Sequence, residues 1–175
     1  RTMFNSDAFK ESMYQKVKNP VEVVVGTLRL TKEIPGPDPR LEDVARQPGF
    51  MGQDILDPPS VEGWHTGREW INSGSLMRRT NFFADMLGDV DRPGVRSIID
   101  RLSSQGEMSP EEFVDGCLDL MGPLEVGQET RQELVNHASV GGSLRWGNEE
   151  ESRTSTGRVS EMLQLIVSLR EYQYN

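Results

Sequence analysis

Residues 57–72 constrain this chain more than any other stretch. They read DPPSVEGWHTGREWIN and hold two prolines, two glycines, two tryptophans and one of the chain's two histidines. Adjacent prolines stiffen the backbone as polyproline II, and glycines permit positive φ or close backbone approach. A segment this rich in special-purpose residues has a definite shape to hold, and it is the first place to look for a ligand. Elsewhere the chain reads as ordinary helix and loop.

Composition limits the kinds of protein this can be. A length of 175 residues suits one domain, and a hydrophobic content of 35% gives it a lean core. The net charge of -9 disfavours binding to nucleic acid or anionic lipid, because both carry negative charge. No apolar run approaches the roughly 20 residues that span a bilayer. Cys117 is the only cysteine, which excludes an internal disulfide and a cysteine-based metal site.

Apolar residues recur at helical spacing along most of the chain and predict an all-α fold. Helices are expected over residues 6–16, 21–30, 41–46, 73 or 75 to 87, 95–102, 110–121, 130–138 and 159–169. Loops such as 34–39 separate them, and the acidic stretch 147–156 is expected to be a mobile loop. No β-hairpin and no repeat is visible. The prediction is a single helical domain over residues 1–175, an irregular multi-helix bundle with long Pro/Gly-rich loops.

The same spacing predicts which side chains face the core. Expected core-facing residues are Phe9, Met13 and Val17; Val21, Val24, Val25 and Leu28; Leu41, Val44 and Ala45; Phe50, Met51, Ile55 and Leu56; and Leu76, Met77, Phe83, Met86 and Leu87. The valine-rich segment would also suit a strand, but its apolar residues fit helical spacing and break strict alternation. Cys117 falls on an apolar stripe and is expected to be a core residue.

Two arginines stand at an unusual position. Arg78 and Arg79 lie near the start of a predicted helix, where the helix dipole disfavours cations. An acidic partner elsewhere in the chain, or a bound anion, would explain them. Simple solvation of both side chains is the favoured alternative.

The central stretch also carries titratable groups. Glu62, His65, Arg68 and Glu69 lie within eight residues, and one histidine with two carboxylates is the minimum for an acid–base pair or a metal site. Their spacing matches no established catalytic or metal-binding motif. His137, the other histidine, lies far away in sequence. The sequence therefore predicts no metal and no cofactor, and it assigns no catalytic residue.

Trp64 and Trp70 have two interpretations. Indole faces stack on sugar rings, and the flanking carboxylates would bond to hydroxyls, so Trp64, His65, Arg68, Glu69 and Trp70 are the candidate ligand-binding residues. Alternatively, the tryptophans anchor a helix-poor part of the core through their bulk and N–H groups. In that account Gln53, Asn72 and Asn81 satisfy loop backbone groups. The structural interpretation is favoured.

Several of these residues form a longer pattern. It comprises Gly52-Gln53, Pro58-Pro59-Ser60-Val61, Gly63-Trp64, Gly67, Trp70-Ile71-Asn72, Arg79 and Asn81-Phe82. The pattern resembles the signature of a bacterial family, the eighteen-hundredth in the series of domains of unknown function. The likeness covers residues 4–83 and the last eighteen or so, whereas residues 89–158 show no signature and form a weakly matched helical region. His65 stands where proline is common in the family, so the histidine is not part of the signature.

The resemblance implies a context but no reaction. Family members are often secreted or envelope proteins, which implies an extracytoplasmic location for this chain. Members usually carry another helical region ahead of this one, so the chain is expected to be the carboxy-terminal part of a longer protein. The expected partner is then another protein or that amino-terminal part.

Two hypotheses of function follow from these observations. The first is a structural or interaction module of the bacterial envelope, which the lack of a catalytic motif favours. The second is a hydrolase or carbohydrate-binding protein with a site near Glu62, His65, Arg68 and Glu69. Exposed indoles beside inward carboxylates would support the second hypothesis, and buried indoles with outward carboxylates would oppose it.

Overall fold

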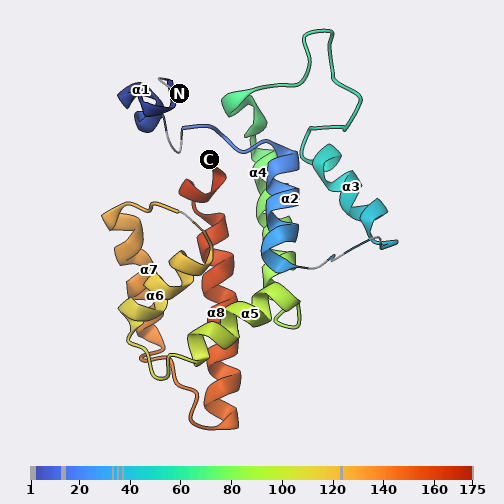
Figure 1. Ribbon diagram of the computed structural model, residues 1–175. Coiled ribbons are helices and arrows are strands. Elements are labelled where there is room, and N and C mark those ends of the chain that lie inside the picture. Colours follow the sequence, from blue (N-terminus) through green and yellow to red (C-terminus); the bar gives the residue numbers. More distant parts are fainter. Residues whose placement is uncertain are drawn as a thin grey trace.

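The computed structural model describes residues 3–12, 15–32, 34, 36, 38–122 and 124–174 (Figure 1). Within those residues the chain forms eight α-helices and three short 3-10 helices, with isolated bridges and no strand. The elements are η1 (Met3–Asn5), α1 (Asp7–Glu11), α2 (Pro20–Thr31), α3 (Leu41–Phe50), η2 (Gly67–Trp70), α4 (Ser73–Gly88), α5 (Pro93–Ser103), α6 (Pro110–Leu120), α7 (Gln128–Val140), α8 (Glu149–Ser168) and η3 (Glu171–Gln173). The predicted all-α fold is confirmed.

Helix α8 is the central element of the bundle. It packs against α4, α5 and α6, while α6 in turn packs against α7. On the other side α2 contacts α3, α4 and α5. Figure 1 shows α6 and α7 flanking α8 on one side, α4 and α2 on the other, and α3 at the far edge. The core is therefore concentrated around α8, and α1 and α3 lie at its periphery.

Local sequence signals explain where the helices begin. Asn19 caps α2 and Ser109 caps α6, each in a capping box with a glutamate three residues later and a proline at the first helical position. Ser6 caps α1 by accepting a hydrogen bond from the Phe9 N–H. These bonds satisfy backbone N–H groups that a helix leaves unpaired at its start.

The buried stripe on α6 confirms the interpretation of the cysteine. Phe113, Val114, Cys117 and Leu118 are all buried, and Cys117 has no exposed surface. Burial raises the pKa of the Cys117 thiol to about 12. Because the thiolate is the reactive form, this cysteine behaves as a small core hydrophobe.

The predicted acidic loop at 147–156 is wrong. Helix α8 begins at Glu149, and Asn148 caps it by accepting a hydrogen bond from the Glu151 N–H at 2.9 Å. Glu149, Glu150 and Glu151 occupy the first turn, where the helix dipole favours negative charge. Ser155 is buried one turn later. A polar sequence thus extends the last predicted helix by about ten residues at its amino end.

Several predicted buried faces are also wrong. In α2 the buried residues are Pro20, Val23, Val24, Thr27 and Thr31, while Val25 is exposed. The two threonines hydrogen-bond to carbonyls of their own helix, which makes their burial tolerable. In α3 only Pro48 is buried, and Leu41 and Ala45 are exposed. Pro48 lies inside α3 rather than breaking it.

Other expectations fail at the ends of the early helices. Helix α1 ends at Glu11 instead of Lys16, and Phe9 is exposed. Val17 is buried, but through a bridge to Tyr174 rather than in a helix. Met13, Pro35 and Pro37 lie outside the described residues. After α3, Met51 is buried as expected, whereas Phe50, Ile55 and Leu56 are exposed. On α4, Leu76 and Met77 are exposed, whereas Phe83, Met86 and Leu87 are buried as expected.

Candidate functional site

The Pro/Trp corner, defined here as residues 51–72, connects α3 to α4. Figure 1 shows it as a long excursion that rises beyond the ends of α3 and α4 before returning through η2. It contains the central stretch singled out in the sequence and five of the seven segments of the family-like pattern. Its shape follows from anchors at its two ends and one bond across its middle.

The first anchor fixes the corner to α2. Met51 is buried, and Gln53 is 9% exposed. The Gln53 side-chain oxygen accepts a hydrogen bond from the Val21 N–H at 3.0 Å, in the first turn of α2. Gln53 thereby satisfies a backbone group that the start of a helix leaves unpaired, rather than a group of the loop itself.

The second anchor is Trp70. Its side chain is 6% exposed, and its carbonyl accepts a hydrogen bond from the Ser75 hydroxyl at 2.8 Å. Asn72 caps α4 by accepting a bond from the Ser75 N–H at 2.9 Å. The end of the corner and the start of α4 are thus held by the same three residues.

Arg79 joins this anchor to the amino-terminal segment. Its side chain is fully buried, and it donates hydrogen bonds to the carbonyls of Lys18 at 2.8 Å and Trp70 at 3.4 Å. Burial lowers the pKa of Arg79 to about 10, and the negative charge of Glu22 opposes that shift. Solvation, the favoured sequence interpretation, is wrong for Arg79 and holds for Arg78, which is exposed. Arg79 acts as a structural clamp between two backbone segments.

A single bond crosses the middle of the corner. The Trp64 indole N–H donates to the Asp54 carbonyl at 3.0 Å, ten residues earlier. Between them Ser60 and Gly63 form a tight turn, in which Gly63 has a φ of 101°. Gly52 and Gly67 also have positive φ, which explains why the signature needs glycine at these positions. Trp64 itself is 37% exposed, unlike Trp70.

The titratable groups of the corner face solvent. Glu62, His65, Arg68 and Glu69 are all exposed. The structure brings His65 close to Glu69, with 3.6 Å between Nδ1 and Oε2 and side chains 57% and 67% exposed, and places the His65 ring edge-to-face with Trp70 at 6.1 Å between centroids. Glu69 also accepts a hydrogen bond from the Thr66 N–H at 3.2 Å, within a capping box for η2. These contacts explain the local fold without a ligand.

Three other signature residues do not act as buried anchors of the corner. Pro58 and Pro59 are exposed, as is Asn81 on α4. Within the part of the chain that the structure describes, Asn81 makes no hydrogen bond to a loop, so its predicted role is wrong. The signature is therefore divided into buried anchors and exposed positions.

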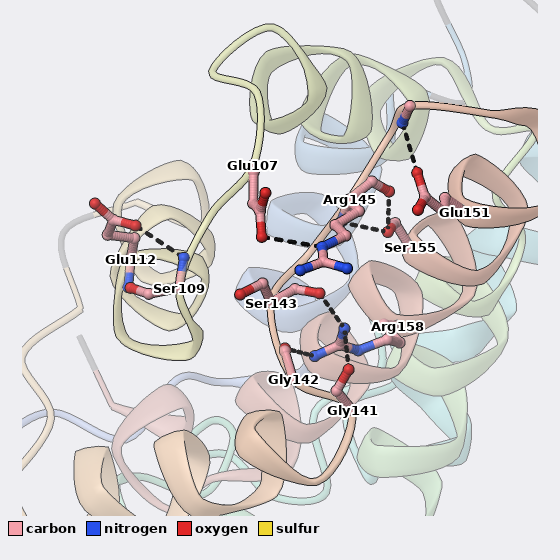
Figure 2. A network of polar contacts seen from close by, with 11 residues as sticks. Glu107, Ser109, Glu112, Gly141, Gly142, Ser143, Arg145, Glu151, Ser155 and Arg158 are labelled. Carbon is pink, nitrogen blue, oxygen red and sulfur yellow. Dashed lines mark hydrogen bonds and ion pairs between the residues drawn. The ribbon is translucent and has the colours of Figure 1, made fainter.

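A second polar network, not anticipated from the sequence, lies at the opposite part of the bundle (Figure 2). Arg158 of α8 donates to the carbonyls of Ala138, Gly141, Gly142 and Ser143 at 2.8 to 3.2 Å. These are the last carbonyls of α7 and of the turn that follows it. The Gly141-Gly142-Ser143 run marks a helix end, but the sequence gives no sign that Arg158 covers it.

The loop before α8 is also held by hydrogen bonds and an ion pair. Met108 and Leu144 pair through two backbone hydrogen bonds, which places Glu107 beside Arg145 at 3.0 Å. The Ser155 hydroxyl bonds to both backbone groups of Arg145, and Glu151 accepts from the Gly147 N–H (Figure 2). An open hollow of about 470 Å³ adjoins Glu107, Arg145 and Trp146. Its charged side chains bond to the chain itself.

Among the described residues, no three His, Cys, Asp or Glu side chains are grouped as a metal ion would require. Within the same residues, no helix is both long enough and apolar enough to cross a membrane.

Comparison with known proteins gives one assignment. No curated protein and no solved structure matches the chain. The model of one protein family, described as protein of unknown function (DUF1800), matches residues 1–174. The matched range includes the corner's glycines with positive φ, the residues Gln53, Trp70, Asn72 and Arg79, and the helices packed around α8. The chain therefore belongs to the DUF1800 family.

Proposed function

We propose that this protein is a non-catalytic interaction module of the bacterial envelope or of secreted complexes, and that it binds a protein partner through the Pro/Trp corner. The extracytoplasmic setting rests on the family resemblance alone. The binding role rests on one structural observation, the uneven distribution of exposed apolar side chains.

That distribution divides the chain in two. Among the described residues, thirteen large hydrophobic side chains are exposed, and twelve of them precede Arg78. They are Met3, Phe4, Phe9, Val25, Leu41, Phe50, Ile55, Leu56, Val61, Trp64, Leu76 and Met77. Val140 alone belongs to the later part of the chain. Single exposed apolar residues are common, but a concentration in one region is typical of a surface that a partner covers.

The corner is the best-defined part of this region. Leu56 is 90% exposed and Val61 is fully exposed, yet the corner's ends are fixed by the buried Met51, Gln53 and Trp70. A loop that is anchored but presents apolar side chains loses little conformational entropy on binding. Such a loop suits recognition better than it suits packing within its own domain.

The hydrolase hypothesis has weaker support. Glu62 and Glu69 face solvent rather than a closed cleft, and Trp70 is buried, so only Trp64 offers part of an indole face. Acid–base catalysis relies on carboxylates and histidines whose pKa is tuned by burial or close neighbours. The exposed His65–Glu69 pair lacks that enclosure.

Site-specific photo-crosslinking tests the proposal. A photoreactive amino acid replaces Val61 in the full-length protein, which is expressed in the organism that encodes it. As the control, the same amino acid replaces Val140, which is 89% exposed and belongs to the later part of the chain. We expect a discrete protein adduct at Val61 and none at Val140.

The mass of the adduct identifies the partner. A separate protein adds its own mass to the chain, whereas contact with a further part of the same polypeptide gives a product of unchanged mass. If Val61 forms no protein adduct, or if Val140 forms the same adducts, the corner is not a docking surface and the proposal is wrong.

A further inference from the structure

We infer that the partner recognised by the Pro/Trp corner is a basic amphipathic segment of a protein, which presents apolar and cationic side chains together. This inference rests on the proposed function and adds the chemistry of the partner. Three features of the corner carry it: its apolar residues, its charges and its fixed shape.

The apolar character of the corner comes from four exposed side chains on one loop. Ile55, Leu56, Val61 and Trp64 are 51%, 90%, 107% and 37% exposed. Trp64 is the least free of them, because its N–H is bonded to the Asp54 carbonyl. An aromatic side chain held in place and partly exposed is a common anchor in protein interfaces.

The charges around these residues have one dominant sign. Asp54, Asp57, Glu62 and Glu69 lie on the corner, against a single Arg68, which gives a net charge of -3 with histidine neutral. All five are exposed. Complementary charge around an apolar centre selects partners and speeds their encounter, whereas like charge repels.

The charge pattern also selects among occupants. A second copy that used the same surface would place these carboxylates opposite one another, since a two-fold contact pairs a patch with itself. An acidic partner would meet the same repulsion. A basic segment with apolar side chains on one face satisfies both features of the corner, and a helix is one way to present it.

The corner's shape is set before the partner binds. Gln53 fixes the entrance to α2, the Trp64–Asp54 bond closes the middle, and Arg79 holds the Trp70 carbonyl at the exit. The exposed residues are thus displayed on a supported loop. Because little of the corner has to become ordered, binding loses little conformational entropy.

Two defined peptides test the inference with the full chain. One is a short amphipathic peptide of leucine and lysine, and the other has the same leucine positions with glutamate in place of lysine. Each is titrated into isotopically labelled protein, and the backbone and indole N–H signals are followed by NMR. We expect the leucine–lysine peptide to shift signals of residues 54–69 first and the leucine–glutamate peptide to leave them unchanged.

Charge variants provide the matched control. The double variant Asp57→Asn, Glu62→Gln should bind the leucine–lysine peptide on the order of fivefold more weakly. This is the size of effect expected when two exposed charges are removed. Asp119→Asn with Glu133→Gln removes the same groups from exposed positions on α6 and α7 and should leave the affinity unchanged. Leu56→Ser with Val61→Ser should also weaken binding, which separates apolar contact from general attraction to an acidic protein.

Three results would overturn the inference. The first is equal binding of both peptides at the corner, which leaves a docking surface without charge selection. The second is an equal loss of affinity in the α6 and α7 control variant. The third is a shift of corner signals with protein concentration alone, which identifies a second copy as the occupant. Failure of the proposed function itself is distinct, because it appears as the absence of a Val61 adduct in the host.

Discussion

Arg79, which is buried, and Arg158, which is half-buried, show how this protein uses guanidinium groups to hold its backbone. Each bonds to backbone carbonyls, two in the case of Arg79 and four in the case of Arg158. Arginine suits this task because its planar group presents several donors in fixed directions. In both places the carbonyls belong to loops or helix ends that secondary structure leaves unsatisfied. The two arginines therefore fix loops that the helices alone would not position.

Replacing Arg158 by methionine tests this role at the residue scale. The variant keeps an apolar side chain beside Phe113 but removes the donors for Ala138, Gly141, Gly142 and Ser143. We expect the free energy of unfolding to fall by about 2–4 kcal/mol, because several charge-assisted hydrogen bonds are lost at a partly exposed site. Urea denaturation followed by circular dichroism measures it.

The control for this variant is Arg153→Met on the same helix, where the side chain is exposed. Its effect should stay within about 0.5 kcal/mol, as for most surface substitutions. Equal losses in the two variants would contradict the role assigned to Arg158.

At the scale of elements, α2 and α5 meet in a contact that only glycine permits. A Cβ added to Gly94 at the start of α5 would lie 2.0 Å from the Leu30 carbonyl oxygen and 2.5 Å from the Thr31 carbonyl carbon. Both are backbone atoms at the end of α2, so neither can move aside as a flexible side chain would. The absence of a side chain at Gly94 thus lets the start of α5 lie directly against the end of α2.

Gly94→Ala should therefore destabilise the protein. We expect a loss of about 3 kcal/mol or more in the free energy of unfolding, since the clash can be relieved only by separating two helices. Gly157→Ala in the middle of α8 is the control, because a Cβ there meets no atom within 4 Å. That substitution should stabilise by about 0.5–1 kcal/mol through helix propensity. Thermal or urea unfolding of both variants measures these changes. A Gly94→Ala protein as stable as the parent would show that the contact between α2 and α5 is not tight.

At the scale of the whole molecule, burial is uneven. Helix α8 buries seven residues and α4 buries six, whereas α1 buries none of its described residues and α3 buries only Pro48. Local stability follows buried contacts, so the molecule combines a firm core around α8 with loosely packed elements at its edge. The edge elements belong to the same part of the chain that exposes twelve apolar side chains.

Hydrogen exchange tests this division. We expect amides in α8 and α4 to exchange only through global unfolding, and those in α1 and α3 to exchange much faster through local opening. Mass spectrometry of peptides from the exchanging protein measures the difference. Uniform protection across all helices would contradict it.

The same experiment can be repeated with a bound partner. Protection gained in residues 50–72, and little change in α6 and α7, is the result expected if the corner is the docking surface. This outcome links the global distribution of stability to the proposed function.

Much of the fold could be predicted from local sequence. Asn19-Pro20 and Ser109-Pro110 mark helix starts because capping needs only neighbouring residues. Cys117 could be assigned to the core because the apolar stripe around it has helical spacing. The corner's glycines and prolines predicted an irregular, shaped segment, since positive φ and fixed φ are properties of the residues themselves.

What local patterns could not predict was decided by packing between distant segments. Val25 lies outside and Thr27 inside because α3, α4 and α5 together set which face of α2 is covered. Trp70 is buried and Trp64 partly exposed, although both lie in the same sixteen-residue stretch. Arg79 is buried because the carbonyl of Lys18, sixty-one residues away, needs a donor there. The sequence by itself determined the helices and the special shape of the corner through short-range interactions. Only the tertiary structure, through contacts between remote residues, decided which of the corner's side chains are anchors and which remain free to bind.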